Sequence, residues 1–299
     1  MKNFKVYLKG WMQLTDWIHQ ARRGLSPSTN QSFGGLETHL TGYLREQGKR
    51  DCPLRSIDAS FCEGFLAYLT HAPNARAGQP RPLKASTQKK LFAQFETLLN
   101  KAVHAGEIKS NPCRELDSAA KPKVVRTERH YLSREEIELL KKAPCRNEAV
   151  KNAFLFCCFC GLRWSDVKSL QWEHLQRSGN PWTLAKCMVK TRDWVFVPIG
   201  KSAREFLPPQ GGKGSVFMLP TAASANAAIH AWATAAGLVK KISFHSSRHT
   251  FATLLLSQGA DIYTTSKLLG HKNLSTTQIY AQIIDRKKVE AIQLLDDLF

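Results

Sequence analysis

The sequence contains little negative charge and no long apolar segment. Its 299 residues include 43 lysines and arginines but only 24 aspartates and glutamates, which gives a formal net charge of +19 at pH 7. No apolar run approaches the ~18–20 residues that a membrane-spanning helix needs. The basic first residues are followed by neither an apolar segment nor a small-residue cleavage site, so no signal peptide is predicted. We expect a cytoplasmic protein without a membrane partner.

The cysteine pattern also lacks what a zinc site requires. Cys157, Cys158 and Cys160 lie together in FLFCCFCGLRW, and the first and third have C-x-x-C spacing. A tetrahedral zinc site needs a second cysteine pair or flanking histidines, and neither is present. The surrounding Phe and Leu residues favour a buried helix with free thiols. We therefore expect no metal and no cofactor.

The excess of basic residues is the strongest signal in the composition. Lysine and arginine are spread along the whole chain instead of being gathered in one amphipathic segment. A membrane surface usually recruits a local basic segment, whereas a phosphate backbone attracts an extended basic surface. The composition therefore favours a nucleic acid as the partner.

Helical patterns dominate the first third of the chain. Apolar residues recur at helical spacing, and SPST after Leu25 is typical of a helix start. The runs that we expect to be helical are residues 1–24, 25–48, 58–71 and 83–108. With no strand pattern among them, they predict an all-helical domain over residues 1–118.

A basic segment follows, and we assign residues 119–130 to an inter-domain linker. It contains a proline and little apolar periodicity. It is either an ordinary solvated linker or a strap that lies on the phosphate backbone, and the sequence leaves both alternatives open. The candidate DNA-binding residues in it are Lys121, Lys123, Arg126 and Arg129.

The remaining residues, 131–299, predict a mostly helical domain with a small sheet. Ser133 and Glu136 have the spacing of a capping box. Residues 147–175 favour a buried helix, a glycine turn and an amphipathic helix. Residues 182–200 alternate and are rich in Val, Phe and Trp, which indicates a β-hairpin with KTRD at its turn. From residue 224 the helical pattern continues to the end. The fold class is mainly α with a small β-sheet.

Six polar groups in this second domain form a recognisable set. His245 and Arg248 are three residues apart, so they lie on one face of a helix. Each group alone has an ordinary explanation as a surface charge, a cap or a core side chain. Their order along the chain is the informative feature: Arg163, Lys190, His245, Arg248, His271 and Tyr280.

This order resembles the tyrosine recombinases, the phage-integrase type of site-specific DNA recombinase. The matching pieces are GLRWSDV, VKTRDWVFVPIG, HSSRHTFATLLLSQG and LLGHKNLSTTQIYAQI, and they span nearly the whole second domain. LSPST, LKASTQKKL and GEIKSNP in the first domain resemble the family's helical core-binding domain more weakly. The resemblance implies that all six residues are catalytic.

The roles that the resemblance implies agree with the chemistry of a phosphodiester. Arg163 and Arg248 would bind the non-bridging oxygens of the transition state. Tyr280 would attack phosphorus, with His245 as base and Lys190 as the acid for the leaving 5′-oxygen. The resemblance also implies that His271 hydrogen-bonds the phosphate. Asp166 matches a recurrent acidic position and is expected to orient the basic groups.

The resemblance implies further partners. The chain would act on double-stranded recombination sites as a homotetramer, and the reaction would pass through a Holliday junction without ATP or metal. The outcome would be integration, excision, inversion or resolution. The apolar pattern of the tail predicts a C-terminal helix that contacts the next protomer, and accessory DNA-bending proteins are a further partner class. No amino-terminal arm-binding domain is expected.

Two other functions compete with this one. A type IB topoisomerase shares the same set of reactive groups but relaxes supercoils as a monomer. A DNA-binding regulator could be built on an inactivated recombinase. The tail and the first domain argue against the topoisomerase, and the complete set of competent residues argues against the regulator.

Overall fold

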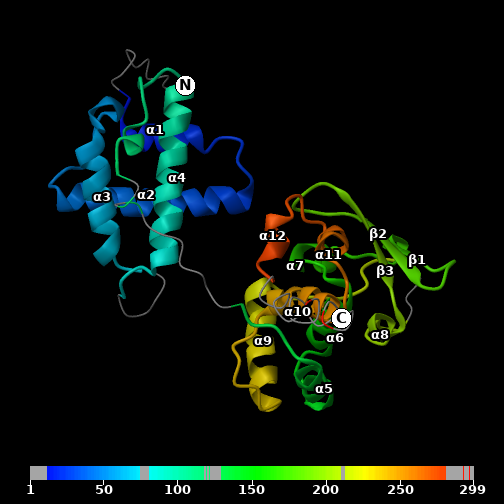
Figure 1. Cartoon of the computed structure of the whole chain (residues 1–299). Coiled ribbons are helices and arrows are strands. Elements are labelled where there is room, and N and C mark those ends of the chain that lie inside the picture. The colour runs from blue at the N-terminus through cyan, green and yellow to red at the C-terminus, as the bar shows by residue number, and fades with distance from the viewer. Residues whose placement is uncertain are drawn as a thin grey trace. The chain divides into compact units, whose positions relative to one another are not determined.

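The computed structural model describes residues 12–74, 81–117, 119, 121, 129–209, 213–280, 292 and 296. The chain divides into two compact units, residues 1–127 and 128–299, and each is described by itself. Helices account for most of the described elements, and a single small sheet lies in the second unit (Figure 1). The predicted fold class is confirmed.

The first unit is built from helices whose starts are marked by local sequence. Ser26 caps the second helix by accepting a hydrogen bond from the Thr29 N–H, and Pro27 occupies its first turn. Asp58 caps the third helix through the Phe61 N–H at 2.8 Å. The α-helices of this unit are α1 (Leu14–Ala21), α2 (Pro27–Glu46), α3 (Ala59–His71) and α4 (Ala85–His104).

The core of this unit lies around α4, which packs against α1, α2 and α3 (Figure 1). Trp17, Phe65 and Phe95 are almost completely buried there. The Trp17 indole N–H donates to the Leu98 carbonyl at 3.1 Å, so the largest side chain of the core leaves no polar atom unpaired. The unit is a self-contained helical domain, as its amphipathic pattern predicts.

The second unit combines helices with the small sheet. Its first helix begins with the predicted capping box, in which Ser133 and Glu136 exchange hydrogen bonds with each other's backbone N–H. Its elements are α5 (Arg134–Lys142), α6 (Glu148–Cys160), α7 (Trp164–Lys168), β1 (Leu175–Gln176), β2 (Trp182–Cys187), β3 (Trp194–Ile199), α8 (Lys201–Arg204), α9 (Ala222–Ala235), α10 (Phe244–Ser257), α11 (Ile262–Leu269) and α12 (Ser275–Gln278).

The sheet is antiparallel in the order β1-β2-β3, and its main part is the predicted hairpin. Cys187 pairs with Trp194 next to the turn. Val195, Val197 and Ile199 are buried, whereas Trp194 is exposed, because successive side chains of a strand point to opposite faces. The short strand β1 was not expected, since two residues carry no readable alternation.

Helices α6 and α10 pack against each other in the middle of this unit. All three neighbouring cysteines of α6 are buried, and they are free thiols, as predicted. Burial raises the pKa of the Cys157 and Cys158 thiols well above the ordinary value. These cysteines are therefore packing residues of the core. None of the helices in the described ranges is long and apolar enough to cross a membrane.

Two glycines end helices at positions where a side chain does not fit. Gly161 follows α6 with φ +68°, and Gly270 follows α11 with φ +61°. A Cβ on Gly161 would overlap the Phe251 ring, and one on Gly270 would meet Val195 at 2.9 Å. Both the left-handed backbone and the close packing therefore require glycine.

Substitution of Gly161 is expected to destabilise the second unit more than substitution of Gly237, a glycine with free space around its Cβ position. Gly237 also has positive φ, +75°, but nothing lies within 4 Å of its ideal Cβ. Gly237→Ala should cost about 1–2 kcal/mol for the left-handed backbone. Gly161→Ala should cost about 1–3 kcal/mol more because the methyl overpacks the Phe251 contact. Denaturant unfolding measures both, and equal losses would contradict the packing argument.

Candidate active site

Two arginines from different helices are fixed by main-chain carbonyls at helix ends. Arg248 of α10 is 2% exposed, and it donates from Nη1 to the Gly161 carbonyl at 2.6 Å and from Nη2 to the Leu269 carbonyl at 2.5 Å. Arg163, at the N-cap of α7, donates from Nη2 to the Gly270 carbonyl at 3.2 Å. Adjacent carbonyls at the end of α11 therefore hold both guanidiniums, and the carbonyl end of a helix favours cations.

The paired guanidiniums are electrostatically unfavourable without an anion. Burial, and then the charge of Arg163, lower the pKa of Arg248 to about 10, so it remains protonated at pH 7. Burial also lowers the pKa of Arg163, although the carboxylate of Asp166 opposes this effect. Arg163 Nη1 is buried and has no hydrogen-bond partner. An unused buried donor beside a second cation favours an anionic acceptor at this position.

His271 follows the same turn and is held by a buried hydroxyl. Its Nδ1 lies 2.8 Å from the Thr277 hydroxyl oxygen. Partial burial and the nearby charge of Arg248 lower the pKa of His271 to about 4, so the imidazole is neutral at pH 7. A neutral imidazole has one N–H donor and one acceptor nitrogen; in the tautomer in which Nδ1 accepts from the Thr277 hydroxyl, Nε2 carries the proton and can donate to an anion. The left-handed Gly270 places this ring directly after the two carbonyls that hold the arginines.

Lys190 lies in the exposed turn between β2 and β3, and Asp166 holds that turn. The Asp166 side chain is fully buried on α7, and its Oδ1 accepts from the Val189 N–H at 2.7 Å. The buried ammonium of Lys186 on β2 donates to the Ser169 carbonyl at the end of α7. These two hydrogen bonds fix the hairpin that carries Lys190 to α7, the helix that follows Arg163. Asp166 thus acts on the backbone beside Lys190.

Tyr280 is buried, and its hydroxyl is hydrogen-bonded to a histidine. The side chain is 6% exposed and packs in a cluster with Phe251, Leu256 and Leu269. Its hydroxyl oxygen lies 2.6 Å from Nδ1 of His249. Burial raises the pKa of Tyr280, whereas the positive charge of Arg248 opposes the rise. The phenol is therefore protonated at neutral pH.

The histidine that contacts the tyrosine was missed in the sequence analysis. His249 follows Arg248 directly and lies one helical turn after His245, to which the sequence analysis assigned the base role. The two rings lie 4.5 Å apart in a T-shaped contact, and His245 is the exposed one. The i, i+4 spacing of the two histidines on a helix was the available signal.

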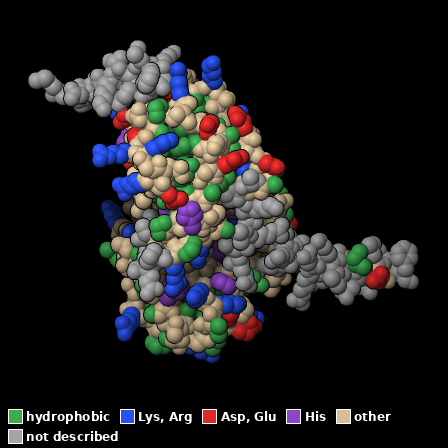
Figure 2. Space-filling model, turned by 90° about the vertical axis from the view of Figure 1, so that its left-hand side faces the viewer, with side chains coloured by type: hydrophobic (Ala, Val, Ile, Leu, Met, Phe, Trp, Pro, Cys, Tyr) green, Lys and Arg blue, Asp and Glu red, His purple; other side chains and the backbone are tan. Residues whose placement is uncertain are grey.

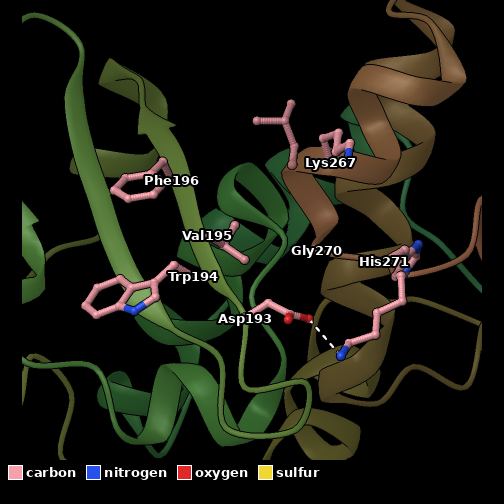
Figure 3. Close-up of a pocket in the computed structure, with 9 residues that line it drawn as sticks. Asp193, Trp194, Val195, Phe196, Lys267, Gly270 and His271 are labelled. Atoms are coloured by element: carbon pink, nitrogen blue, oxygen red, sulfur yellow. Dashed lines mark ion pairs between the residues drawn. The ribbon is translucent and has the colours of Figure 1, made fainter.

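A pocket of about 380 Å³ lies beside this cluster, between β3 and the end of α11 (Figure 3). Val195 points toward the Gly270 turn, and Trp194 lies on the other side of the strand. The ion pair between Lys272 and Asp193, at 3.3 Å, joins the residue after His271 to the hairpin. The pocket wall thus connects the His271 turn with the strand that carries the Lys190 turn.

Only part of the predicted basic linker lies within the described residues. Lys121 forms an ion pair with Glu96 of the first unit at 3.0 Å, and Arg129 is exposed. Lys123 and Arg126 lie outside the described residues. Histidine, lysine and arginine side chains lie next to one another in the lower part of Figure 2. The part of the chain that the structure describes contains no cluster of three histidine, cysteine or carboxylate side chains placed to bind a metal ion.

Comparison with known families covers both units of the chain. Residues 130–287 match the phage integrase family, and residues 8–118 match the phage integrase SAM-like domain. The first match alone spans more than half of the chain and includes all six predicted catalytic residues.

Individual relatives agree with the family match. The chain is 28% identical over 285 residues to tyrosine recombinase XerD of Shewanella oneidensis, covering 87% of this chain and 88% of the relative. It is 26% identical over 299 residues to a tyrosine recombinase of Pseudothermotoga lettingae, covering 94% and 96%. These alignments extend through both units.

Solved structures share the fold at lower identity. A lambda integrase fragment, solved as a dimer bound to a COC′ core site, matches with a TM-score of 0.67 and 19% identity over 90% of this chain and 95% of its own. XerH bound to difH matches with a TM-score of 0.61 and 17% identity over 88% and 79%. From the family match and the relatives, the chain belongs to the phage integrase family and is a tyrosine-type site-specific DNA recombinase.

Proposed function

We propose that Tyr280 cuts and rejoins DNA strands through a 3′-phosphotyrosyl intermediate. The observation that supports this most directly is the unpaired Nη1 of Arg163, buried beside the guanidinium of Arg248. A phosphodiester oxygen is an anionic acceptor that would satisfy this donor and relieve the repulsion between the two cations. The recombinase family of the chain makes a DNA phosphate the natural anion.

The charge arrangement suits a five-coordinate phosphorus better than the ground state. Attack by an oxygen adds negative charge to the non-bridging oxygens of the phosphate. Arg163 and Arg248 are fixed before the reaction, and His271 supplies a neutral donor, so little reorganisation is needed as the charge develops. Charge stabilisation of this kind needs no metal ion.

The proposed proton transfers complete the reaction. The Tyr280 oxygen forms a bond to phosphorus, the bond to the 5′-oxygen breaks, and Lys190 supplies the proton that the 5′-oxygen needs. We propose that His245 accepts the phenol proton, which is the role of base that the family resemblance implies. A 5′-hydroxyl then attacks the phosphotyrosine and restores a phosphodiester. Each ester replaces another of similar energy, so ATP is not required.

The two units have separate proposed roles. Residues 1–118 form the core-binding domain on DNA, residues 119–130 are the basic linker, and residues 131–299 are the catalytic domain. The separate family matches over residues 8–118 and 130–287 support this division, and the DNA complexes of lambda integrase, the Tn1549 integrase and XerH support a DNA partner. Of the proposed linker contacts, Arg129 is exposed, whereas Lys121 must leave Glu96 to reach a phosphate. The proposed location is the cytoplasm.

The proposed assembly is a homotetramer on two recombination sites that passes through a Holliday junction. A related lambda integrase structure is a tetramer bound to a Holliday junction, which supports the proposal. The tail beyond Lys288 is the proposed contact between protomers, and its Ile292 side chain is 57% exposed. Accessory DNA-bending proteins are proposed only as additional partners.

Tyr280→Phe is expected to abolish the covalent protein–DNA adduct, because the ring stays in place but the attacking oxygen is lost. The measurement is adduct formation on a nicked suicide substrate, resolved on a denaturing gel. Tyr263→Phe is the matched control, since Tyr263 is an exposed tyrosine of α11. If the adduct persists in Tyr280→Phe, Tyr280 is not the nucleophile, and a DNA-binding regulator becomes the better description of the chain.

Arg163→Ala and Arg248→Lys are expected to lower the cleavage rate by ~10²–10³-fold, because each removes a fixed donor to the developing charge. DNA affinity should change little, since many other lysines and arginines supply the non-specific attraction. Single-turnover cleavage and equilibrium binding are measured on the same DNA, with the exposed Lys241→Ala as control. Equal losses in cleavage and binding would contradict the transition-state role.

Deletion of residues 289–299 is expected to reduce cooperative assembly on paired sites while leaving binding to a single site nearly unchanged. The reason is that the apolar tail would lose its surface on the next protomer. Gel-shift titration on one-site and two-site DNA separates these effects. Unchanged cooperativity would remove the tail from the proposed interface.

A further inference from the structure

The contact between Tyr280 and His249 is the only direct polar contact of the nucleophile's hydroxyl in the described part of the chain. Both side chains are buried, at 6% and 7% exposure. The partner is therefore neither of the arginines nor His245. A buried hydroxyl that has a single partner takes its orientation from that partner.

The protonation state of His249 determines the direction of the hydrogen bond. Burial, and then the nearby charges of His245 and Arg129, lower the pKa of His249 to about 3, with smaller effects from Arg248 and His271. The imidazole is therefore neutral at pH 7 and has one acceptor nitrogen. A phenol is a good donor and a poor acceptor, so the Tyr280 hydroxyl donates to Nδ1.

Only the hydrogen bond to His249 sets the direction of the Tyr280 hydroxyl, because the other neighbours of the ring in the described structure are apolar. The ring packs among apolar side chains of α10 and α11, which limit its position but offer no polar atom. His249 is fixed in turn, because its ring lies edge-on to His245 on the same helix. The chain His245–His249–Tyr280 thus runs from an exposed ring to the buried phenol.

We propose that His249 is a positioning residue for strand cleavage: its Nδ1 accepts a hydrogen bond from Tyr280 and so fixes the direction of the phenol oxygen. This inference rests on the proposed function of Tyr280 as the nucleophile. A fixed attacking atom lowers the entropic cost of reaching phosphorus, and small displacements of such an atom are costly. His245 remains the proposed base for the phenol proton.

Two substitutions separate this role from simple packing. His249→Asn places an amide oxygen near the position of Nδ1, so it keeps an acceptor without a basic nitrogen. His249→Leu fills similar space without any acceptor. We expect the Leu variant to form the covalent adduct ~10–100-fold more slowly under single-turnover conditions. The Asn variant should lose less than about tenfold, and both should bind DNA like the parent protein.

The outcomes decide the proposal. Parental adduct rates in the Leu variant overturn it. An Asn variant that is as slow as the Leu variant, with an unchanged Tm, also overturns it, because the basic nitrogen and not the hydrogen bond would then be needed. Slow cleavage by the Leu variant with recovery in the Asn variant supports it.

A second measurement tests the bond without any catalysis. Thermal unfolding of His249→Leu, Tyr280→Phe and the double variant forms a cycle. If the two side chains are hydrogen-bonded in the free protein, the two losses in Tm will not add. Additive losses overturn the proposal even if Tyr280 is the nucleophile. Conversely, an adduct that persists in Tyr280→Phe rejects the proposed function but leaves this cycle interpretable.

Discussion

The site depends on the hydrogen bonds between two guanidiniums and the main-chain carbonyls at helix ends. Arg248 reaches across the core to the ends of α6 and α11, and Arg163 reaches the carbonyl that follows. Helix ends leave carbonyls without intrahelical partners, and buried cations lack water, so each group satisfies the other. Because Nη1 of Arg163 has no partner in the described structure, the arrangement satisfies the carbonyls and still leaves one donor unused.

The same constraint explains why a helix as polar as α10 can be buried. Ser247, Arg248 and Thr250 are all less than 3% exposed, and each forms a hydrogen bond within the unit or to its own helix. His249 is neutral in these surroundings and bonds to Tyr280. The helix thus delivers one cation and two imidazoles to a small volume. The repulsion between the guanidiniums of Arg248 and Arg163, and not the neutral imidazoles, is the electrostatic reason why this site favours an anion.

Sequence patterns predicted the helices, the hairpin and the capping box because these depend on local spacing. They also gave the order of the six candidate groups. They could not give the partners of those groups, which are set by contacts across the fold. His249 shows this limit, since its bond to Tyr280 joins residues 31 apart in the sequence. Asp166 shows it as well: its neighbour in space is the Val189 amide of the hairpin.

Anchoring through the main chain has a consequence for how such proteins diverge. A carbonyl oxygen is present whatever side chain its residue carries, so the acceptors for the arginines do not depend on the identity of Leu269. Only the glycines at 161 and 270 are restricted, by backbone shape and close packing. Substitutions can therefore accumulate around the candidate site without moving the two arginines. Such tolerance is compatible with the low identity, below one residue in five, of the solved structures that share this fold.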